Sequence, residues 1–567
     1  MEASGAIIVQ RDRTLLLECA HPGFETAREE LAAFAELSKS PSLYHTYRIT
    51  PLSLWHAAAL GQTAEQINST LTRLARWGVP AGLQEEISLL LSRYGQLTLH
   101  RHVDQPDRLT LRAETAALLD ELEQQPGWTE IGLTRSGPAE CDCCVASRGK
   151  LKQELTRLGY PVLDYAGYHE GQRLSVEWRR PDRGGEGDDG SLELRPYQQE
   201  ALQRFQGEGG TGGSGVVVLP CGAGKTVVGI AVLESLQCET LILTSNATSV
   251  RQWIEELRER TQLQDEEIGE YSGERRQVRP VTVATYQILT HRRSKGGPFV
   301  HMNLFNERNW GLIIYDEVHL LPAPVFRATA EIQATRRLGL TATLVREDGR
   351  EGDVFSLIGP KRYDMPWKML ERQGWIASVE CIEIAVPMEP VLRRQYLYAE
   401  GKEKFRLAAA NPAKRVLVAQ LVKAHSGAAI LVIGQYLDQL DQLAEYIRAP
   451  LITGKTPQEE RNRLYAAFNE GRIQVLIVSK VANFAVNLPD ASVAIEVSGA
   501  FGSRQEEAQR LGRILRPKAG GNRAYFYTLV TADSREQDFA LRRRLFLTEQ
   551  GYEYAVRTTA YGEENVL

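Results

Sequence analysis

The sequence predicts an α/β protein with two parallel sheets in tandem, preceded by small α+β modules. One observation is that short apolar runs alternate with helix-like segments from about residue 191 onward, an order typical of parallel sheets covered by helices. A second is that these runs are almost wholly apolar, as expected of strands buried on both faces. Their number indicates two sheets. The runs are GVVVLP (215–220), TLILTS (240–245), VTVAT (281–285), GLIIYD (311–316), RLGLTAT (337–343), AAILVIG (428–434), QVLIVS (474–479), VAIEVS (493–498) and AYFYTLV (524–530).

Composition is that of an ordinary globular protein, and 567 residues are enough for roughly three to five domains. The net charge of -5 gives no overall attraction to nucleic acid, so any polyanion must be bound by a local basic groove. No apolar run approaches the ~18 residues of a membrane span, and the start MEASGAIIVQRDR has no signal-peptide core. We therefore expect no membrane association and a cytoplasmic location.

Seven cysteines are scattered along the chain, and their odd number argues against a disulfide framework. Cys141, Cys143 and Cys144 are clustered in ECDCCV, but the nearby sequence offers no second pair at metal-ligand spacing. Structural or incidental thiols are favoured, while a metal or redox role stays open.

A phosphate-binding loop is predicted in VVVLPCGAGKTVVGIAVL (216–233), which places a strand, a tight loop and a helix in that order. Glycines let the backbone approach an anion, and the amides at the helix start can cradle phosphates. Lys225 supplies a positive charge to the same phosphates, and the Thr226 hydroxyl can bind Mg²⁺. Leu219 breaks the first position of G-x-x-x-x-G-K-[ST], so the strand-loop-helix context supports the prediction. The nucleotide-binding residues expected here are Pro220, Cys221, Gly222, Ala223, Gly224, Lys225 and Thr226.

The run GLIIYDEVHLLP (311–322) leads directly into two carboxylates. With a phosphate loop on an earlier strand, an acid at the carboxyl end of a later parallel strand is placed to hold magnesium. We expect Asp316 to bind Mg²⁺ and Glu317 to orient and deprotonate the attacking water. His319 lies too far along the chain to reach the γ-phosphate and is expected to couple neighbouring elements. For an isolated acidic pair, a solvated turn would be the alternative.

A basic helix is predicted in RQEEAQRLGRILRPK (504–518), with Arg510, Arg513 and Arg516 at three-residue intervals on one face. Facing a nucleotide across a cleft between two sheets, Arg513 and Arg516 would act as catalytic arginine fingers. A solvated basic face is the alternative.

Together these motifs resemble those of a superfamily 2 helicase, which implies two RecA-like domains in tandem. LRPYQ (194–198) resembles its adenine-binding element, with Arg195 and Gln198 as polar contacts. DEVH (316–319) resembles the second motif and TAT (341–343) the third. QRLGRILR (509–516) resembles the sixth and adds Gln509 to the expected nucleotide-binding residues.

More narrowly, the chain resembles the XPB family of helicases over most of its length. The features are VLPCGAGKT (218–226), DEVHLLPAPVFR (316–327), LGLTATLVREDG (338–349), LIGPKRYDMPW (357–367), EAQRLGRILRPK (507–518), FLTEQGYEY (546–554) and, ahead of the motor, HTYRITPLSLWHAAALG (45–61) and RGKLKQELTRLGYPVLDYAGY (148–168). The resemblance implies an ATP-dependent 3′-to-5′ DNA helicase or duplex translocase that uses Mg²⁺, binds DNA independently of sequence and serves DNA repair. It also implies a nuclease or repair-factor partner on the N-terminal modules.

Composition and resemblance together predict the domain organisation. The segments are 1–95, a winged-helix-like module; 96–180, a damage-recognition-like α/β module; 181–190 (PDRGGEGDDG), a linker; 191–375, the first RecA-like domain; and 376–567, the second, with a thumb-like helical insertion at 389–413. An ordinary solvated helix is the alternative for the insertion.

Strand separation is assigned by the resemblance to the triplet Arg346, Glu347 and Asp348, although VREDGRE alone would be read as a charged surface loop. One departure concerns SKVANFAVNLPDA (479–491), where Ala485 and Asn487 stand in place of the glycine and aspartate of the superfamily's fifth motif. This puts the coupling of nucleotide to DNA by that segment in doubt.

Contacts to DNA phosphates are expected from hydroxyl and amide side chains that follow strands. Thr244 in TSNATSV and Thr285 with Gln287 in VATYQIL are such candidates, and Thr341 and Thr343 of the third motif join them. For Thr244, Thr285 and Gln287, a role in helix capping or in a turn is an equally good interpretation. For the whole protein, a translocase that does not separate strands and an ATP-gated DNA-binding scaffold for a nuclease also stay open.

Overall fold

The structure of the protein, a computed structural model, describes residues 5–41, 43–126, 128–179, 194–207, 212–294, 296–344, 349–479, 491–499, 511–512 and 522–558. The predicted linker, 181–190, lies outside them. The chain forms two compact units. The first is Met1–Glu36, Thr46–Leu219 and Gly224–Met365, and the second is Leu37–His45, Pro220–Ala223 and Pro366–Leu567.

Four N-terminal strands form a small sheet in the order β1-β2-β4-β3. The elements of this region are β1 (Ile7–Val9), β2 (Thr14–Glu18), α1 (Phe24–Leu31), β3 (Glu36–Lys39), β4 (Tyr44–Arg48), α2 (Pro51–Ala59), α3 (Ala64–Leu74) and α4 (Leu83–Ser92). Thr50 and Thr63 each begin a helix with a capping box, because their side chains accept from the backbone N–H three residues on.

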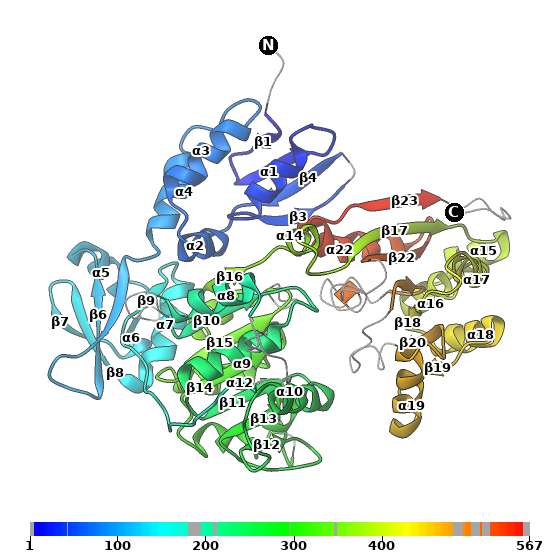
Figure 1. Cartoon of the computed structure of the whole chain (residues 1–567). Coiled ribbons are helices and arrows are strands. Elements are labelled where there is room, and N and C mark those ends of the chain that lie inside the picture. The colour runs from blue at the N-terminus through cyan, green and yellow to red at the C-terminus, as the bar shows by residue number, and fades with distance from the viewer. Residues whose placement is uncertain are drawn as a thin grey trace, which may run out of the picture. The chain divides into compact units, whose positions relative to one another are not determined.

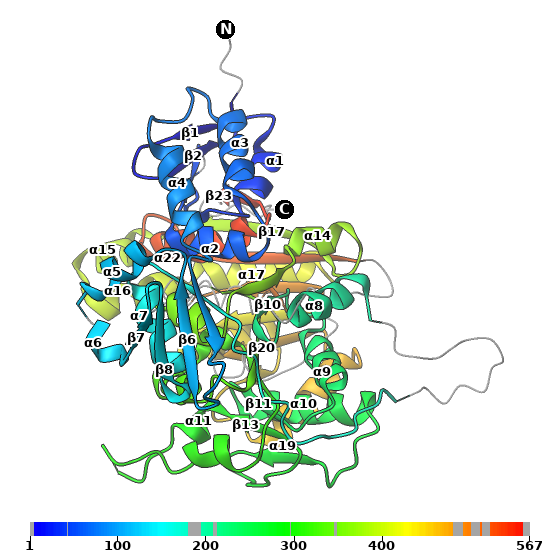
Figure 2. The ribbon, with the colours of Figure 1, turned by 90° about the vertical axis from the view of Figure 1, so that its left-hand side faces the viewer.

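A five-stranded sheet follows, in the order β7-β8-β6-β5-β9. Figure 2 shows its strands β6, β7 and β8. Its elements are β5 (Leu97–Arg101), β6 (Arg108–Ala113), α5 (Ala116–Glu123), α6 (Trp128–Ile131), β7 (Thr134–Gly137), β8 (Glu140–Cys144), η1 (Val145–Ser147), α7 (Arg148–Arg157) and β9 (Val162–Asp164). The helices α2, α3 and α4 precede β5, and β5 belongs to this second sheet. The assignment of the modules stays a prediction.

The cysteine cluster lies on β8, where Cys141 and Cys143 are buried and Cys144 is exposed. Burial raises the pKa of Cys141 to about 11 and that of Cys143 to about 12, so both are unreactive thiols at neutral pH. Within the described residues, no group of three or more His, Cys, Asp or Glu side chains is arranged to hold a metal ion.

The first large sheet has seven strands in the order β12-β13-β11-β14-β15-β10-β16 (Figure 1). Every strand pair within it is parallel. Its elements are α8 (Pro196–Gln206), β10 (Ser214–Val218), α9 (Lys225–Leu236), β11 (Thr240–Thr244), α10 (Ala247–Arg260), β12 (Ile268–Tyr271), β13 (Val281–Thr285), α11 (Tyr286–Leu289), η2 (Met302–Asn306), β14 (Leu312–Asp316), η3 (Val318–Leu320), α12 (Ala323–Glu331), β15 (Arg336–Thr341), α13 (Glu351–Leu357) and β16 (Lys361–Asp364).

Helices cover both faces of this sheet, which explains the apolar runs. Val216 and Val218 share a core with Val325 of α12 and Val354 of α13. Residues between them on the strands point the opposite way, and Leu340 faces Gly229 of α9. Strands β10, β11 and β13 are therefore buried at every position.

The second unit contains another seven-stranded sheet, in the order β19-β20-β18-β21-β22-β17-β23, again with parallel pairing in every pair that the structure describes. Its elements are α14 (Trp367–Arg372), β17 (Ser378–Val386), α15 (Pro390–Tyr398), α16 (Gly401–Ala409), α17 (Ala413–Ala424), β18 (Ile430–Gly434), α18 (Leu437–Ile447), β19 (Leu451–Ile452), α19 (Gln458–Asn469), β20 (Val475–Ser479), β21 (Val493–Glu496), β22 (Arg523–Thr531), α22 (Arg535–Glu549) and β23 (Tyr554–Thr558).

These two parallel sheets confirm the predicted fold class. The insertion 389–413 contains two helices, α15 and α16, and its thumb-like role stays a prediction. Within the described ranges, no helix combines the length and the apolar character needed to cross a membrane.

Candidate active site

The phosphate loop connects β10 to α9 with two glycines in the left-handed region, where φ is 81° at Gly222 and 78° at Gly224. Gly224 is the N-cap of α9, and Lys225 and Thr226 are the first two residues of the helix. The helix start thus places its first backbone amides and the positive end of its dipole beside the Lys225 ammonium. This geometry suits a phosphate group, and the binding role of each loop residue stays a prediction.

The adenine-motif glutamine lies against this loop. A Cβ added to Gly224 would stand 2.5 Å from Nε2 of Gln198, so a side chain at residue 224 would displace Gln198. Oε1 of buried Gln198 accepts from the backbone N–H of Arg195 at 3.0 Å, and Nη1 of Arg195 donates to the Tyr197 hydroxyl at 3.0 Å. The predicted residues Arg195 and Gln198 therefore share one bonded turn at the start of α8.

Asp316 ends β14 and is held from two other elements. Trp253 of α10 donates its indole N–H to Oδ2 of Asp316 at 2.9 Å, and the Tyr286 hydroxyl donates to the Asp316 backbone carbonyl at 2.9 Å. Burial, together with the neighbouring carboxylate of Glu317, raises the pKa of Asp316 to about 6, although Trp253 and Lys225 act in the opposite direction.

Glu317 adopts a left-handed backbone conformation, with φ 51° and ψ 54°, which is costly for a residue with a Cβ. This turns its side chain toward Lys225, whose Nζ lies 3.8 Å from Oε1 of Glu317. Oε2 lies 3.4 Å from Nδ1 of His319. The carboxylate therefore stands between the phosphate-loop lysine and the histidine of the same motif.

His319 connects the acidic motif to β15. Its Nδ1 and Oγ1 of Thr341 are 2.7 Å apart, and both side chains are buried. The Thr341 hydroxyl donates to the carbonyl of Thr343 at 2.5 Å and accepts from the Thr343 N–H at 3.0 Å. A continuous chain of contacts thus joins Lys225, Glu317, His319 and Thr341, and the coupling role of His319 stays a prediction.

The threonines predicted to contact DNA are buried. Thr244 donates toward the backbone carbonyls of Asn246 and Ala284, and Thr285 accepts from the Ile288 N–H as the N-cap of α11. The capping alternative accounts for this hydroxyl. The Thr341 hydroxyl is committed to the bonds above, and Oγ1 of Thr343 is buried without a partner among the described residues. The side chain of Gln287 is exposed.

Several predicted site residues lie outside the described residues. They are Gln509, Arg510, Arg513 and Arg516 of the sixth motif, Arg346, Glu347 and Asp348 of the predicted strand-separating triplet, and Ala485 and Asn487 of the fifth motif. Their roles stay predictions.

Trp253 and Tyr286 were not predicted from the sequence. In TSVRQWIEEL the tryptophan occupies the apolar face of an amphipathic helix, where a core role is the ordinary interpretation. The indole N–H is the signal that could have found it, because a buried tryptophan usually donates to a partner.

The residues present fit a nucleotide with a divalent cation. The Gly222–Gly224 turn admits phosphate oxygens close to the backbone, and Thr226 adds a hydroxyl at the helix start. Two adjacent carboxylates with a raised pKa at Asp316 are a donor set that a divalent cation stabilises.

Two all-parallel sheets in tandem define a RecA-like nucleoside-triphosphate motor, since the first carries a phosphate loop after β10 and an acidic pair at the carboxyl end of β14, with β15 between these two strands. The family model described as ERCC3/RAD25/XPB C-terminal helicase matches residues 370–566. Models described as helicase conserved C-terminal domain and as type III restriction enzyme, res subunit, match residues 7–137 and 191–346.

A relative in Kineococcus radiotolerans, named DNA 3′-5′ helicase XPB, is 51% identical over 97% of this chain and 96% of its own. One of the same name in Mycobacterium tuberculosis is 50% identical over 98% of both chains. The Saccharomyces cerevisiae protein named general transcription and DNA repair factor IIH helicase/translocase subunit XPB/SSL2 is 32% identical over 98% of this chain and 72% of its own. The chain belongs to the XPB family of helicases, and this membership implies ATP and a divalent metal.

Proposed function

We propose that the protein is an ATP-dependent DNA helicase or duplex DNA translocase that moves 3′ to 5′ and couples ATP hydrolysis to duplex opening in DNA repair. The observation that carries the proposal is the cluster of Lys225, Asp316 and Glu317 at the carboxyl edge of the first parallel sheet, in a chain of the XPB family. The cluster supports the proposal because it combines one cation with two carboxylates, the kinds of group that phosphoryl transfer to water uses.

Each residue of the cluster has a distinct role in the proposed reaction. Bound ATP with Mg²⁺ supplies the γ-phosphoryl group and a metal charge upon it. Lys225 and the loop amides bind the phosphate oxygens, and the Thr226 hydroxyl and the Asp316 carboxylate hold the metal. Glu317 orients the attacking water and accepts its proton at a carboxylate oxygen.

The second sheet is proposed to complete the site. Arg513 and Arg516 would stabilise the charge on the transferred group, and Gln509 would contact the nucleotide. Arg346, Glu347 and Asp348 would separate the strands. Their assignment rests on the resemblance of their motifs to those of the family.

Coupling to DNA is proposed to use the contact between His319 and Thr341. Oε2 of Glu317 lies 3.4 Å from Nδ1 of His319, which contacts Thr341. A shift of the carboxylate during the nucleotide cycle would therefore displace His319, and with it β15 and the segment that leads to Arg346. DNA phosphates would be bound without regard to sequence. Gln287 stays a candidate contact, since its side chain is exposed.

Partners and location are extended from the family. A nuclease or repair factor on the N-terminal modules, and a cytoplasmic location, stay predictions. The S. cerevisiae relative is named as a subunit of a transcription and repair factor, which supports assembly with other proteins.

The test is strand displacement on forked DNA carrying a 3′ or a 5′ single-stranded tail, with hydrolysis measured on the same substrates. Displacement should require ATP and a 3′ tail. Lys225→Ala should abolish both activities, while Lys423→Ala, an exposed lysine in the last turn of α17, should change neither. Displacement from the 5′ tail only would refute the proposed polarity.

A translocase without strand separation is a second candidate, because residues 191–346 also match the restriction-enzyme model. A blunt duplex distinguishes the two. DNA-stimulated hydrolysis without displacement from any fork would favour this candidate, whereas absence of DNA-stimulated hydrolysis would favour the ATP-gated scaffold.

A further inference from the structure

A cavity of about 230 Å³ lies within the first unit, at the junction of α2, α7 and β9 with the edge of the first large sheet. Lys152, Asp164 and Tyr94 line it from the N-terminal modules, and Ser214 and Arg362 line it from the sheet. It shares no residue with the active site. Polar and charged groups therefore line a partly open cavity that the proposed hydrolysis does not use.

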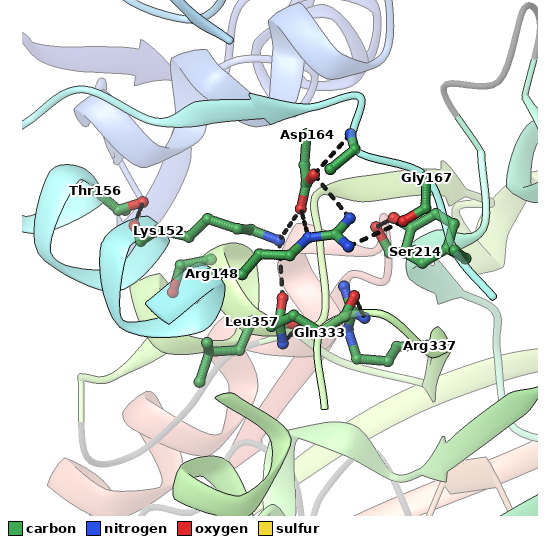
Figure 3. Close-up of polar contacts among 12 residues, drawn as sticks. Arg148, Lys152, Thr156, Asp164, Gly167, Ser214, Gln333, Arg337 and Leu357 are labelled. Atoms are coloured by element: carbon green, nitrogen blue, oxygen red, sulfur yellow. Dashed lines mark hydrogen bonds and ion pairs between the residues drawn. The ribbon is translucent and has the colours of Figure 1, made fainter. Parts of the chain in front are cut away.

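The wall formed by α7 carries a buried ionic network (Figure 3). Arg148 donates to both carboxylate oxygens of Asp164, from Nε at 2.9 Å and from Nη2 at 2.8 Å. Nζ of Lys152 donates to Oδ2 of Asp164 at 3.2 Å and to Oε1 of Gln333 at 3.0 Å. One carboxylate therefore serves two buried cations.

A third buried cation, Arg337, stands in the same network without a carboxylate of its own. Its Nε donates to the Leu357 carbonyl at 2.7 Å and its Nη1 to the Gln333 carbonyl at 2.7 Å, while Nη2 has no partner in the described chain. Tyr168 lies between the guanidinium groups, 5.3 Å from Arg148 and 5.6 Å from Arg337. Positive charge thus exceeds negative charge in this buried region.

The pKa values of the network reflect this excess. Burial, opposed by Asp164 and reinforced by Arg337 and Arg148, lowers the pKa of Lys152 to about 7. Burial acts to raise the pKa of Asp164, but Lys152 and Arg148 outweigh it and lower that pKa to about 2. Both shifts have the direction that an additional anion would oppose.

The part of the lining that comes from the first large sheet brings a further cation to the cavity. Nε of Arg362 donates to the Ser214 carbonyl at 3.0 Å. Its stem passes over Gly215, where a Cβ would stand 2.4 Å from Cγ of Arg362. Oγ of Ser214 accepts from the Tyr168 hydroxyl at 2.7 Å, so its own proton remains to be donated.

We propose that this cavity is a binding site for a small phosphate-type oxyanion, held between Lys152 and Arg362 with hydroxyl donors around it. A volume of about 230 Å³ is below the range of about 300–1,000 Å³ for drug-sized ligands, which favours a small anion over a nucleotide. The bound anion would neutralise cations contributed by α7 and by β16 and so strengthen their association. This site does not rest on the proposed function.

The test is calorimetric titration of inorganic phosphate into full-length Lys225→Ala protein without nucleotide, at constant ionic strength. This background removes the lysine that would bind phosphate in the phosphate loop. Phosphate should bind, and Arg362→Gln or Lys152→Met should weaken the affinity at least tenfold. Arg362→Lys, which keeps the charge, should weaken it less than threefold.

A second variant tests the site without altering any charge. Ala59→Leu places a larger side chain in the cavity wall and should also weaken phosphate binding. Melting temperatures without phosphate show that each variant is folded. The phosphate group could come from free phosphate or from a nucleotide monophosphate, and titration with AMP distinguishes the two. AMP binding that is weakened by Lys152→Met or Arg362→Gln would assign the site to a nucleotide monophosphate. Phosphate affinity that is absent in the Lys225→Ala background, or unchanged by the cavity variants, would overturn the site.

Discussion

The indole Nε1 of Trp253 donates a hydrogen bond to Oδ2 of Asp316 over 2.9 Å. Trp253 is buried in α10, and its ring lies against α9, where a Cβ added to Gly229 would stand 2.6 Å from Cη2 of the ring. The bond joins the helix that follows β11 to the carboxylate proposed to hold the metal. A displacement of α10 would therefore reorient Asp316.

Trp253→Phe should weaken the use of Mg²⁺. A hydrogen bond to a charged group contributes about 1.5–3 kcal/mol, so we expect the Mg²⁺ concentration for half-maximal hydrolysis to rise roughly tenfold. Mg²⁺-dependent binding of a fluorescent ADP analogue measures the same change without turnover. Trp310→Phe is the matched control, because buried Trp310 donates to the Leu304 carbonyl, a neutral acceptor. Equal effects of the two substitutions would assign Trp253 a packing role only.

Glu317→Gln should bind ATP and hardly hydrolyse it. The amide keeps the shape of the side chain but cannot accept the proton, and general-base catalysis contributes about 10²–10⁴-fold. Nucleotide binding and single-turnover hydrolysis measure the two effects separately. Glu331→Gln, at the exposed end of α12, should leave both unchanged. Loss of ATP binding would instead give Glu317 a structural role.

Thr341→Val should reduce the stimulation of hydrolysis by DNA more than hydrolysis without DNA. The substitution keeps the shape of the side chain but removes the hydroxyl that contacts Nδ1 of His319 and accepts from the Thr343 N–H. A buried polar group that loses its hydrogen-bond partner, such as the His319 ring nitrogen or the Thr343 N–H, destabilises the folded state by about 1–3 kcal/mol. Thr329→Val is the control, since Thr329 of α12 is equally buried. Its hydroxyl bonds to that of Tyr315 on β14, in the sheet that also contains Thr341. An unchanged ratio of stimulated to basal hydrolysis would exclude coupling through this contact.

The first unit should become more stable as the pH rises above 7, because the buried Lys152 side chain then loses its proton. Because the folded pKa of Lys152 is lowered from 10.5 to about 7, the unfolded state binds more protons between these values. The free energy of unfolding therefore rises with pH across this window through this group. The melting temperature of the wild type should rise relative to that of Lys152→Met between pH 7 and pH 9. Parallel curves for the two proteins would show that the ammonium is not penalised in the folded state.

Arg346→Ala should impair strand displacement while hydrolysis continues. This follows from the proposed role of the triplet in separating strands. Rates on forked DNA and DNA-stimulated hydrolysis are compared for the same preparation. Arg350→Ala, which removes an arginine whose Nε lies 2.9 Å from Oδ2 of Asp353, controls for loss of charge in this region. An unchanged displacement rate would count against a wedge at Arg346.

The sequence predicted the central strands of both large sheets but not their edges. Each apolar run from GVVVLP to AYFYTLV corresponds to an observed strand. The edge strands β12, β16, β19 and β23 were missed because they are short or carry charged residues, as in KRYD (361–364). An edge strand has one strand neighbour and less burial, so no continuous apolar run marks it. β17 was also missed, since two glutamates interrupt its apolar positions.

The site was predictable where a local pattern defines it. Lys225 and Asp316 are positioned by strand-loop junctions that can be recognised within a dozen residues. The bond between Trp253 and Asp316 joins residues 63 positions apart, and it depends on how α10 packs on the sheet. Sequence periodicity gives the buried face of a helix but not the partner of one atom on it.

The placement of β10 has a consequence for synthesis of the chain. Its first partner to be made is β15, with Val216 opposite Gly339, so 123 residues separate 216 from 339. At about 5–20 residues per second, the strand that carries the phosphate loop would leave the ribosome about 6 to 25 s before its first neighbour. An apolar segment with unpaired backbone groups for that long is a natural substrate for chaperones, and slow translation of residues 219–335 should increase aggregation of the nascent protein.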